Sequence, residues 1–273
     1  MLSKKDIQIF VPNVLLKSND FICMRPHASL NEYISSYNIT FPTEAMMSIV
    51  SMPSGCASLN IESNGKNLLI SLEGPTTMPY IVDSLTVMPE IMITIEFKPA
   101  GLYALTGINQ KELTDQTIPY EAANPIFSKL LAEAVEKSTS VLKLVSNLDV
   151  LFLTNMYTDC HPQLKYAYKS IVAYSGNITV KELSSNTNYS ERQLNRIFNQ
   201  HMGLSVKSFS RLIRINKTFG LLKKPHNSLS IVSDVMGFHD LSHFIRDFKS
   251  VSGLSPQEFR NNMSDFYINP IKF

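Results

Sequence analysis

Two arginines and two asparagines lie within eight residues of the C-terminal half, at the spacing of one helix face. Arg192, Asn195, Arg196 and Asn199 are related by separations of three and four residues, which places them along one side of an α-helix. Arginine can bond guanine O6 and N7 together, and asparagine can bond adenine N6 and N7. We therefore expect these side chains to bond base edges or phosphates. The alternative is a solvated helix face, which is normally richer in Glu and Lys than in Arg and Asn.

Helix-start signals position this face. Thr179 is followed three residues later by Glu182, and Ser190 by Gln193, and each pair is typical of a capping box. Two helices are therefore predicted to begin eleven residues apart, with residues 185–188 as the short turn between them. This is helix-turn-helix geometry, and it turns the apolar side of the second helix inward: Leu194, Ile197 and Phe198.

The same unit recurs about 50 residues later. Five residues of the first copy reappear with identical type and spacing in the second: Phe198, Gly203, Leu204, Ser205 and Phe209 recur as Phe248, Gly253, Leu254, Ser255 and Phe259. The second copy contains Gly237 at its turn and Asp240 as a helix cap.

The second recognition helix is less polar than the first. Phe244 and Phe248 face inward, and the outer face is predicted to comprise Leu241, Ser242, Ile245, Arg246 and Lys249. Leu241 and Ile245 either meet a thymine methyl group or pack internally. Arg246 is the strongest candidate for a base contact.

A long helix is predicted over residues 205–222, ended by Pro225. Eighteen residues of helix span ~27 Å, which is close to the ~34 Å of one DNA turn. The predicted recognition helices, about residues 190–201 and 240–250, could therefore enter adjacent major grooves of one duplex.

Charge divides the chain in the same way. Residues 1–159 contain 10 Lys and Arg against 16 Asp and Glu, a formal charge of −6, whereas residues 160–273 contain 15 against 7, a formal charge of +8. A basic C-terminal part is typical of a module that binds a polyanion, although a merely solvated basic surface would have the same charge. We find no signal-peptide pattern and no apolar window of membrane-spanning length, so we expect a cytoplasmic protein without membrane contact.

Residues 1–158 are predicted to form a β-rich domain with C-terminal helices. Residues Ile91–Phe97 alternate between apolar and mostly polar side chains, which indicates a strand with one buried face, and residues 56–61 and 68–72 flank an Asn-Gly turn as a hairpin. Helices are expected from near Ala100, Asn124 and Ser138. The last contains apolar residues at helical spacing, which either pack on the β part or form a dimer seam: Val141, Leu142, Val145, Leu148 and Phe152.

The C-terminal part resembles the AraC/XylS family of bacterial transcription regulators. The resemblance covers about 100 residues and rests on these motifs: Ser190-x-x-x-Leu194-x-Arg196-x-Phe198, Gly203-x-Ser205, Arg214-Ile215, Gly237-Phe238-x-Asp240-x-Ser242-x-Phe244, Phe248-Lys249, Gly253-x-Ser255-Pro256 and Phe259-Arg260. It implies an all-α domain over residues 162–262 with two helix-turn-helix units joined by a long helix, followed by a tail at residues 263–273. It also implies binding to promoter DNA, usually activation, and contact with RNA polymerase. The base-contacting places of the family fall on Arg192, Asn195, Arg196, Leu241, Ser242 and Arg246.

The N-terminal part resembles more weakly the domain that often precedes such units, through Met52-Pro53-Ser54-Gly55-Cys56 and residues 97–105. This resemblance implies a β-rich, cupin-like domain that senses an effector or mediates dimerisation. The overall fold class is therefore a two-domain α+β protein. A domain that only binds a partner, without sensing, is the alternative.

Catalysis and cofactors are not expected. Three scattered cysteines, Cys23, Cys56 and Cys160, allow neither a disulfide framework nor the zinc-cysteine site of a DNA-repair alkyltransferase. His239 and His243 have the spacing of a helical zinc pair, but the intervening glutamate of a metalloprotease is absent. A DNA-modifying enzyme is thus the least favoured alternative, and we predict no metal site.

Overall fold

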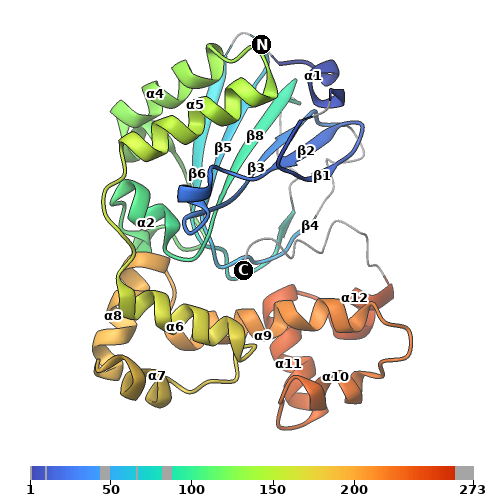
Figure 1. The fold of residues 1–273 in the computed structure, drawn as a ribbon. Coiled ribbons are helices and arrows are strands. Elements are labelled where there is room, and N and C mark those ends of the chain that lie inside the picture. The colour runs from blue at the N-terminus through green and yellow to red at the C-terminus, as the bar shows by residue number, and fades with distance from the viewer. Residues whose placement is uncertain (1, 10, 44–49, 66, 82–87, 262–273) are drawn as a thin grey trace.

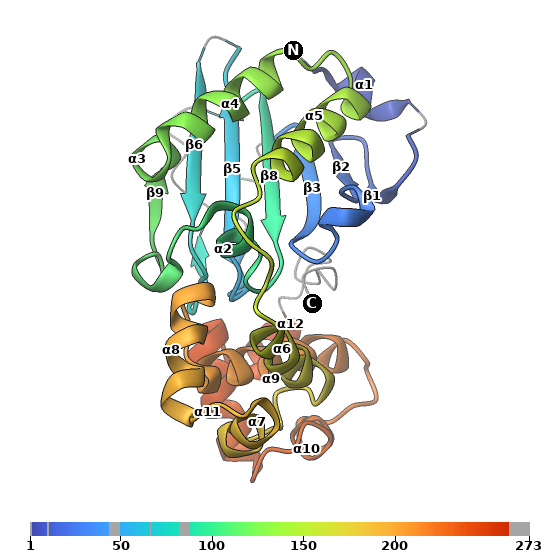
Figure 2. The same ribbon diagram turned by 60° about the vertical axis from the view of Figure 1, so that its left-hand side comes forward.

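The computed structural model describes residues 2–9, 11–43, 50–65, 67–81 and 88–261. An N-terminal β-sheet domain stands above a helical C-terminal domain in both views (Figures 1 and 2). The predicted α+β class with two domains is confirmed. The tail predicted at residues 263–273 lies outside the described residues.

The N-terminal domain is built on a seven-stranded sheet in the order β1-β2-β3-β8-β5-β6-β9, and a two-stranded sheet pairs β4 with β7. Every pairing among the described strands is antiparallel. The strands are β1 Val14–Lys17, β2 Phe21–Met24, β3 Ile34–Thr40, β4 Val50–Ser51, β5 Ser58–Ser63, β6 Leu68–Glu73, β7 Tyr80–Ile81, β8 Ile91–Phe97 and β9 Thr117–Pro119.

Two sequence predictions for this sheet are confirmed. Strand β8 has the predicted bounds, and its buried and half-buried residues alternate along its length. Strands β5 and β6 pair as the predicted hairpin around the Asn-Gly turn. Gly65 in that turn has φ +81°, a conformation that side chains with a Cβ rarely adopt.

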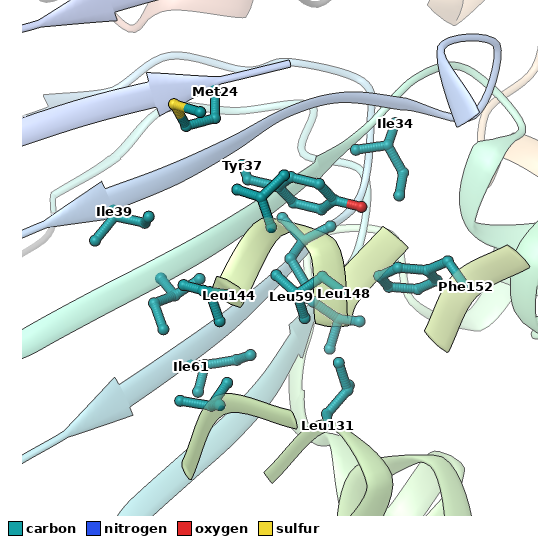
Figure 3. Close-up of a cluster of buried hydrophobic side chains, with 14 of the residues drawn as sticks. Met24, Ile34, Tyr37, Ile39, Leu59, Ile61, Leu131, Leu144, Leu148 and Phe152 are labelled. Atoms are coloured by element: carbon teal, nitrogen blue, oxygen red, sulfur yellow. The ribbon is translucent and has the colours of Figure 1, made fainter. Parts of the chain in front are cut away.

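The described residues of the N-terminal domain also form these short or medium helices: α1 Lys4–Gln8, the 3-10 helix η1 Ala28–Leu30, α2 Gly101–Thr106, the 3-10 helix η3 Gln110–Glu112, α3 Tyr120–Ala123, α4 Pro125–Glu136 and α5 Val141–Thr154. Helices α4 and α5 cover one face of the sheet (Figure 2). The hydrophobic core lies between these two helices and the sheet, and it includes Tyr37, Leu59, Leu131 and Phe152 (Figure 3).

One side of helix α5 packs into the core of the N-terminal domain. Val141, Val145, Leu148 and Phe152 are buried in the core, as the packing alternative predicted. Leu142 is the exception, with 48% of its surface exposed. After α5, residues 155–161 form no helix or strand and lead to the helical domain.

The C-terminal domain is entirely helical within the described residues. Its helices are α6 Pro162–Ala173, α7 Val180–Thr187, α8 Glu191–Met202, α9 Val206–Leu222, α10 Leu229–Val235, α11 Leu241–Ser252 and α12 Pro256–Asn261. Two separate apolar clusters hold it together, one around α6 to α8 and the first half of α9, the other around the second half of α9 and α10 to α12. The predicted duplication therefore corresponds to two small cores joined by the 17-residue helix α9.

Candidate nucleic-acid interface

The first unit is formed by α7, its turn and α8. Thr179 and Glu182 form the predicted capping box, in which Glu182 N donates to Thr179 Oγ1 at 3.1 Å and Thr179 N to Glu182 Oε2 at 2.8 Å. Asn188 takes the left-handed conformation at the turn, with φ +58°. Ser190 then caps α8 by accepting from Gln193 N at 3.2 Å. These local bonds fix where the recognition helix begins.

The second unit, α10 and α11, repeats this arrangement with other residues. Gly237 makes the turn with φ +68°, and Asp240 caps α11 by accepting from His243 N at 2.6 Å. The backbone N–H of His243 and the ring of His239 together lower the pKa of the Asp240 carboxyl. The carboxylate is therefore ionised at neutral pH, as a cap at the positive end of the helix requires.

Each recognition helix has one buried apolar side and one exposed polar side. Leu194 and Phe198 of α8, and Phe244 and Phe248 of α11, have no exposed surface. Burying these side chains attaches each helix to its own unit. The predicted polar residues are consequently turned away from the cores, with the most exposed being Arg192, Arg196, Ser242, Arg246 and Lys249.

The exposed side of each recognition helix contains cations. Within the described residues, no salt bridge or hydrogen bond engages the guanidinium groups of Arg192, Arg196 and Arg246 or the ammonium group of Lys249. Exposed cations without partners are available to phosphates and base edges. An open hollow lies over α11, lined by Ser242, Ile245, Arg246, Lys249 and Ser250.

The two asparagines of α8 are placed differently from the arginines. Asn195 is half-buried; its Nδ2 donates to Glu191 O at 3.0 Å, and its Oδ1 accepts from Val206 N, the first residue of α9, at 3.1 Å. Asn199 is also half-buried and donates to Asn195 O at 2.8 Å. Asn195 therefore links α8 to the start of α9, and its predicted base contact would require breaking both bonds.

The apolar candidates of α11 lie at the edge of the exposed face. Leu241 is 39% exposed and Ile245 is half-buried. This position is compatible both with contact to a thymine methyl group and with packing inside the unit.

Two residues that join the units were not singled out as functional from the sequence. Arg214 on α9 donates to Gly176 O at 2.8 Å and places its guanidinium over the ring of Phe238 at 5.4 Å. Asn177 donates to Met236 O at 3.0 Å. Arg214 belongs to the Arg214-Ile215 motif of the family resemblance, but its partners lie in separate turns that no local sequence pattern connects.

The two histidines at the spacing of a helical zinc pair each lie beside a carboxylate. His239 Nδ1 is 3.0 Å from Asp240 Oδ2, and His243 Nε2 is 3.4 Å from Asp247 Oδ2. In the described part of the chain, no three His, Cys, Asp or Glu side chains are grouped to hold a metal ion. None of the described helices has the length and apolar character that crossing a membrane requires.

Comparison with known proteins assigns the helical domain. A family described as "Helix-turn-helix domain" matches residues 183–262, and a "Domain of unknown function" family, DUF6597, matches residues 23–119. The chain is similar to the arabinose operon regulatory protein of Escherichia coli K12, at 28% identity over 156 residues, which is 52% of this chain and 53% of that protein. The C-terminal domain is of the AraC type.

Other relatives of this AraC-type domain are similar over comparable or shorter stretches. The Msm operon regulatory protein of Streptococcus mutans is 29% identical over 92 residues, 34% of this chain and 33% of that protein. The chain thus spans between a third and about half of the length of these curated relatives. A crystal structure of ToxT from Vibrio cholerae aligns with 90% of this chain and 97% of its own, at 14% identity and a TM-score of 0.42.

Proposed function

We propose that this chain is a sequence-specific DNA-binding transcription regulator that inserts α8 and α11 into adjacent major grooves of a promoter. The proposal rests on the two-sided character of both recognition helices: fully buried phenylalanines on one side, and on the other exposed cations that have no ion-pair partner among the described residues. Helix-turn-helix units use such faces to contact bases and phosphates. The charge of +8 on residues 160–273 favours a polyanionic partner.

The relatives support a regulatory outcome for this binding. Two of them are named as regulatory proteins of operons, and the family resemblance implies activation through contact with RNA polymerase. We therefore propose that the chain acts in the cytoplasm on nucleoid DNA as an activator. We propose no catalytic role.

The polar face of the sheet supports effector sensing by the N-terminal domain. On the side opposite the apolar core, paired strands align Asn38 with Thr94 and Thr94 with Asn60. Ser36 on the same side is fully buried, and its hydroxyl has no hydrogen-bond partner among the described residues. The half-buried side chains of Asn38, Asn60 and Thr94 line the same face and offer amide and hydroxyl groups to a polar ligand.

Dimerisation through α5 is the second candidate role of the N-terminal domain. Leu142, Val150 and Leu153 are 48%, 57% and 38% exposed, and their spacing places them along one stripe of the helix. An apolar stripe of this kind suits a second copy of the chain. Sedimentation velocity of the wild type and of Val150→Glu tests this role. If α5 mediates dimerisation, the wild type sediments as a dimer and the variant as a monomer.

Selection from a random-sequence duplex pool tests the main proposal. We expect the full chain to enrich one sequence class and to bind it at least about a thousandfold more tightly than unselected duplex. Failure to enrich any sequence at moderate salt, while general DNA binding persists, would contradict sequence-specific recognition.

A further inference from the structure

One segment of the N-terminal domain touches the same point of both recognition helices. Gly203 and Gly253, which are equivalent in the internal repeat, end α8 and α11 in left-handed conformations. A Cβ atom placed on Gly203 would lie 2.6 Å from Cγ of Pro75, and one placed on Gly253 would lie 3.1 Å from Cγ of Pro79. Both prolines belong to residues 74–79, which connect β6 to β7 and which we name the strap.

The strap is bonded firmly to its own domain. Thr77 donates to Asp115 twice, from its backbone N to Oδ1 and from its hydroxyl to Oδ2, both at 2.6 Å. Asp115 N returns a bond to Pro75 O at 3.1 Å, and Gly74 N donates to Gln116 O at 2.9 Å. The backbone of the strap therefore cannot shift without breaking bonds to residues 115–116.

Residues beside the strap hold the end of α8. Thr114 donates to Gly203 O at 2.6 Å, and the Gln110 side chain donates to His201 O. The Tyr103 ring lies against the His201 ring, tilted by 36° with centroids 3.8 Å apart, and the Tyr103 hydroxyl accepts from Gln200 Nε2 at 3.0 Å. The last turn of the first recognition helix is thus held by bonds from residues about 90 positions earlier in the chain.

The other side of the strap leads to the long helix between the units. Thr76 accepts from Ser54 N at 3.2 Å through its hydroxyl and from Gly55 N at 3.3 Å through its carbonyl. The neighbouring Pro53 carbonyl accepts from Asn216 Nδ2 of α9 at 3.2 Å. The N-terminal domain consequently contacts α8 and α9 through hydrogen bonds, and α11 through the packing of Pro79 against Gly253.

We infer that the strap fixes the orientation of α8 relative to α11, so that both are presented to DNA together. It contacts the C-terminal ends of the two helices and leaves the exposed residues Arg192, Arg196 and Arg246 uncovered. Holding two linked binding elements in matching positions raises the effective concentration of the second after the first has bound. This inference rests on the proposed function, in which α8 and α11 enter two adjacent major grooves.

The strap also gives the polar sheet face a physical route to the recognition helices. Glu73, the last residue of β6, directly precedes the strap and accepts from Ser58 Oγ at 3.1 Å and from Asn60 Nδ2 at 3.4 Å. Both donors lie on the polar face proposed to bind an effector. A ligand that displaced these bonds would act on β6 and hence on the strap.

Thr77→Val tests the inference, because it removes the hydroxyl bond to Asp115 with little change in volume. The probe is the duplex selected by the wild-type chain, with two derivatives in which one half of the protected site is scrambled. We expect Thr77→Val to bind the intact duplex about tenfold more weakly and both derivatives within about twofold of wild type. Equal weakening on all three duplexes, or no weakening on the intact one, would overturn the inference.

Controls and a DNA-free readout make the result independent of the proposed function. Thr77→Ser retains the hydroxyl, and Thr139→Val changes a surface threonine between α4 and α5; both should behave as wild type. Amide hydrogen exchange without DNA should accelerate in Thr77→Val at residues 201–204 and at 252–254. Unchanged exchange at both helix ends would overturn the inferred role of the strap, even if the chain binds DNA specifically. A wild-type chain that selects no duplex would overturn only the proposed function.

Discussion

Asn195 and Arg196 are adjacent in the chain and have different physical roles in α8. Their spacing and polarity predict one common face, yet the Asn195 amide bonds two backbone groups while the Arg196 guanidinium is exposed. Sequence periodicity could not separate them, because the partners of Asn195 are backbone atoms that every residue possesses. Arg196 is exposed on the same side of α8 as Arg192, and it is therefore the better candidate for a base contact.

Arg196→Ala should therefore change specificity, whereas Lys249→Ala should change affinity. Loss of a bidentate arginine contact costs about 1–3 kcal/mol on the selected duplex and relaxes the preference at the contacted base pair. Loss of a phosphate contact weakens all sequences alike and lowers the salt slope by about 1. Anisotropy titrations on selected and scrambled duplexes at several salt concentrations measure both effects. Equal losses for both variants on every duplex would refute these roles.

Asn195→Ala should destabilise the fold. The substitution leaves Val206 N without its acceptor at the start of α9, and loss of a helix-capping bond costs about 1 kcal/mol in the free energy of unfolding. Urea titration provides the measurement, and Gln193→Ala, on the exposed side of the same helix, is the matched control. Identical stability of both variants would show that the bond to α9 contributes nothing.

At the scale of elements, the last turn of α8 is sensitive to pH through His201. Burial lowers the pKa of His201 to about 4 from 6.5, and the charge of His161 adds to the effect. The folded state therefore binds this proton less readily than the unfolded state, so stability is full above pH 6.5 and decreases as pH falls from 6.5 towards 4.

His201→Phe isolates this titration. Phenylalanine retains a ring against Tyr103 and cannot be protonated, so the difference in unfolding free energy between variant and wild type should be constant above pH 7. Below pH 6.5 the variant should lose less stability than the wild type. Parallel pH profiles down to pH 4.5 would show that His201 is not the group responsible.

Elements with local signals could be predicted from the sequence, and those defined by distant contacts could not. Caps at Ser190 and Asp240, the β5–β6 turn and the length of α9 all depend on residues a few positions apart. The strap depends on Pro75 and Pro79 meeting Gly203 and Gly253, more than 120 residues away. Proline and glycine there predict only turns, because the sequence pattern contains no information about what faces them.

At the scale of the whole molecule, the two domains differ in charge and share a bonded interface. Glu32 of the acidic N-terminal part pairs with Lys165 and Lys169 of α6, which adds to the bonds around the strap. The pairs are partly exposed, so we assign them little stability. The domain boundary near residue 158 stays a prediction. The structure contains one apolar core in the N-terminal domain and two in the helical C-terminal domain, among the described residues.

We propose that α8 and α11 read neighbouring major grooves of one duplex. Dimethyl sulfate protection of guanine N7 on the selected duplex tests this claim, because that atom lies in the major groove. We predict two protected clusters about one helical turn, ~10 base pairs, apart, with Arg196→Ala removing one cluster and Arg246→Ala the other. A single protected cluster that survives Arg246→Ala would contradict the account.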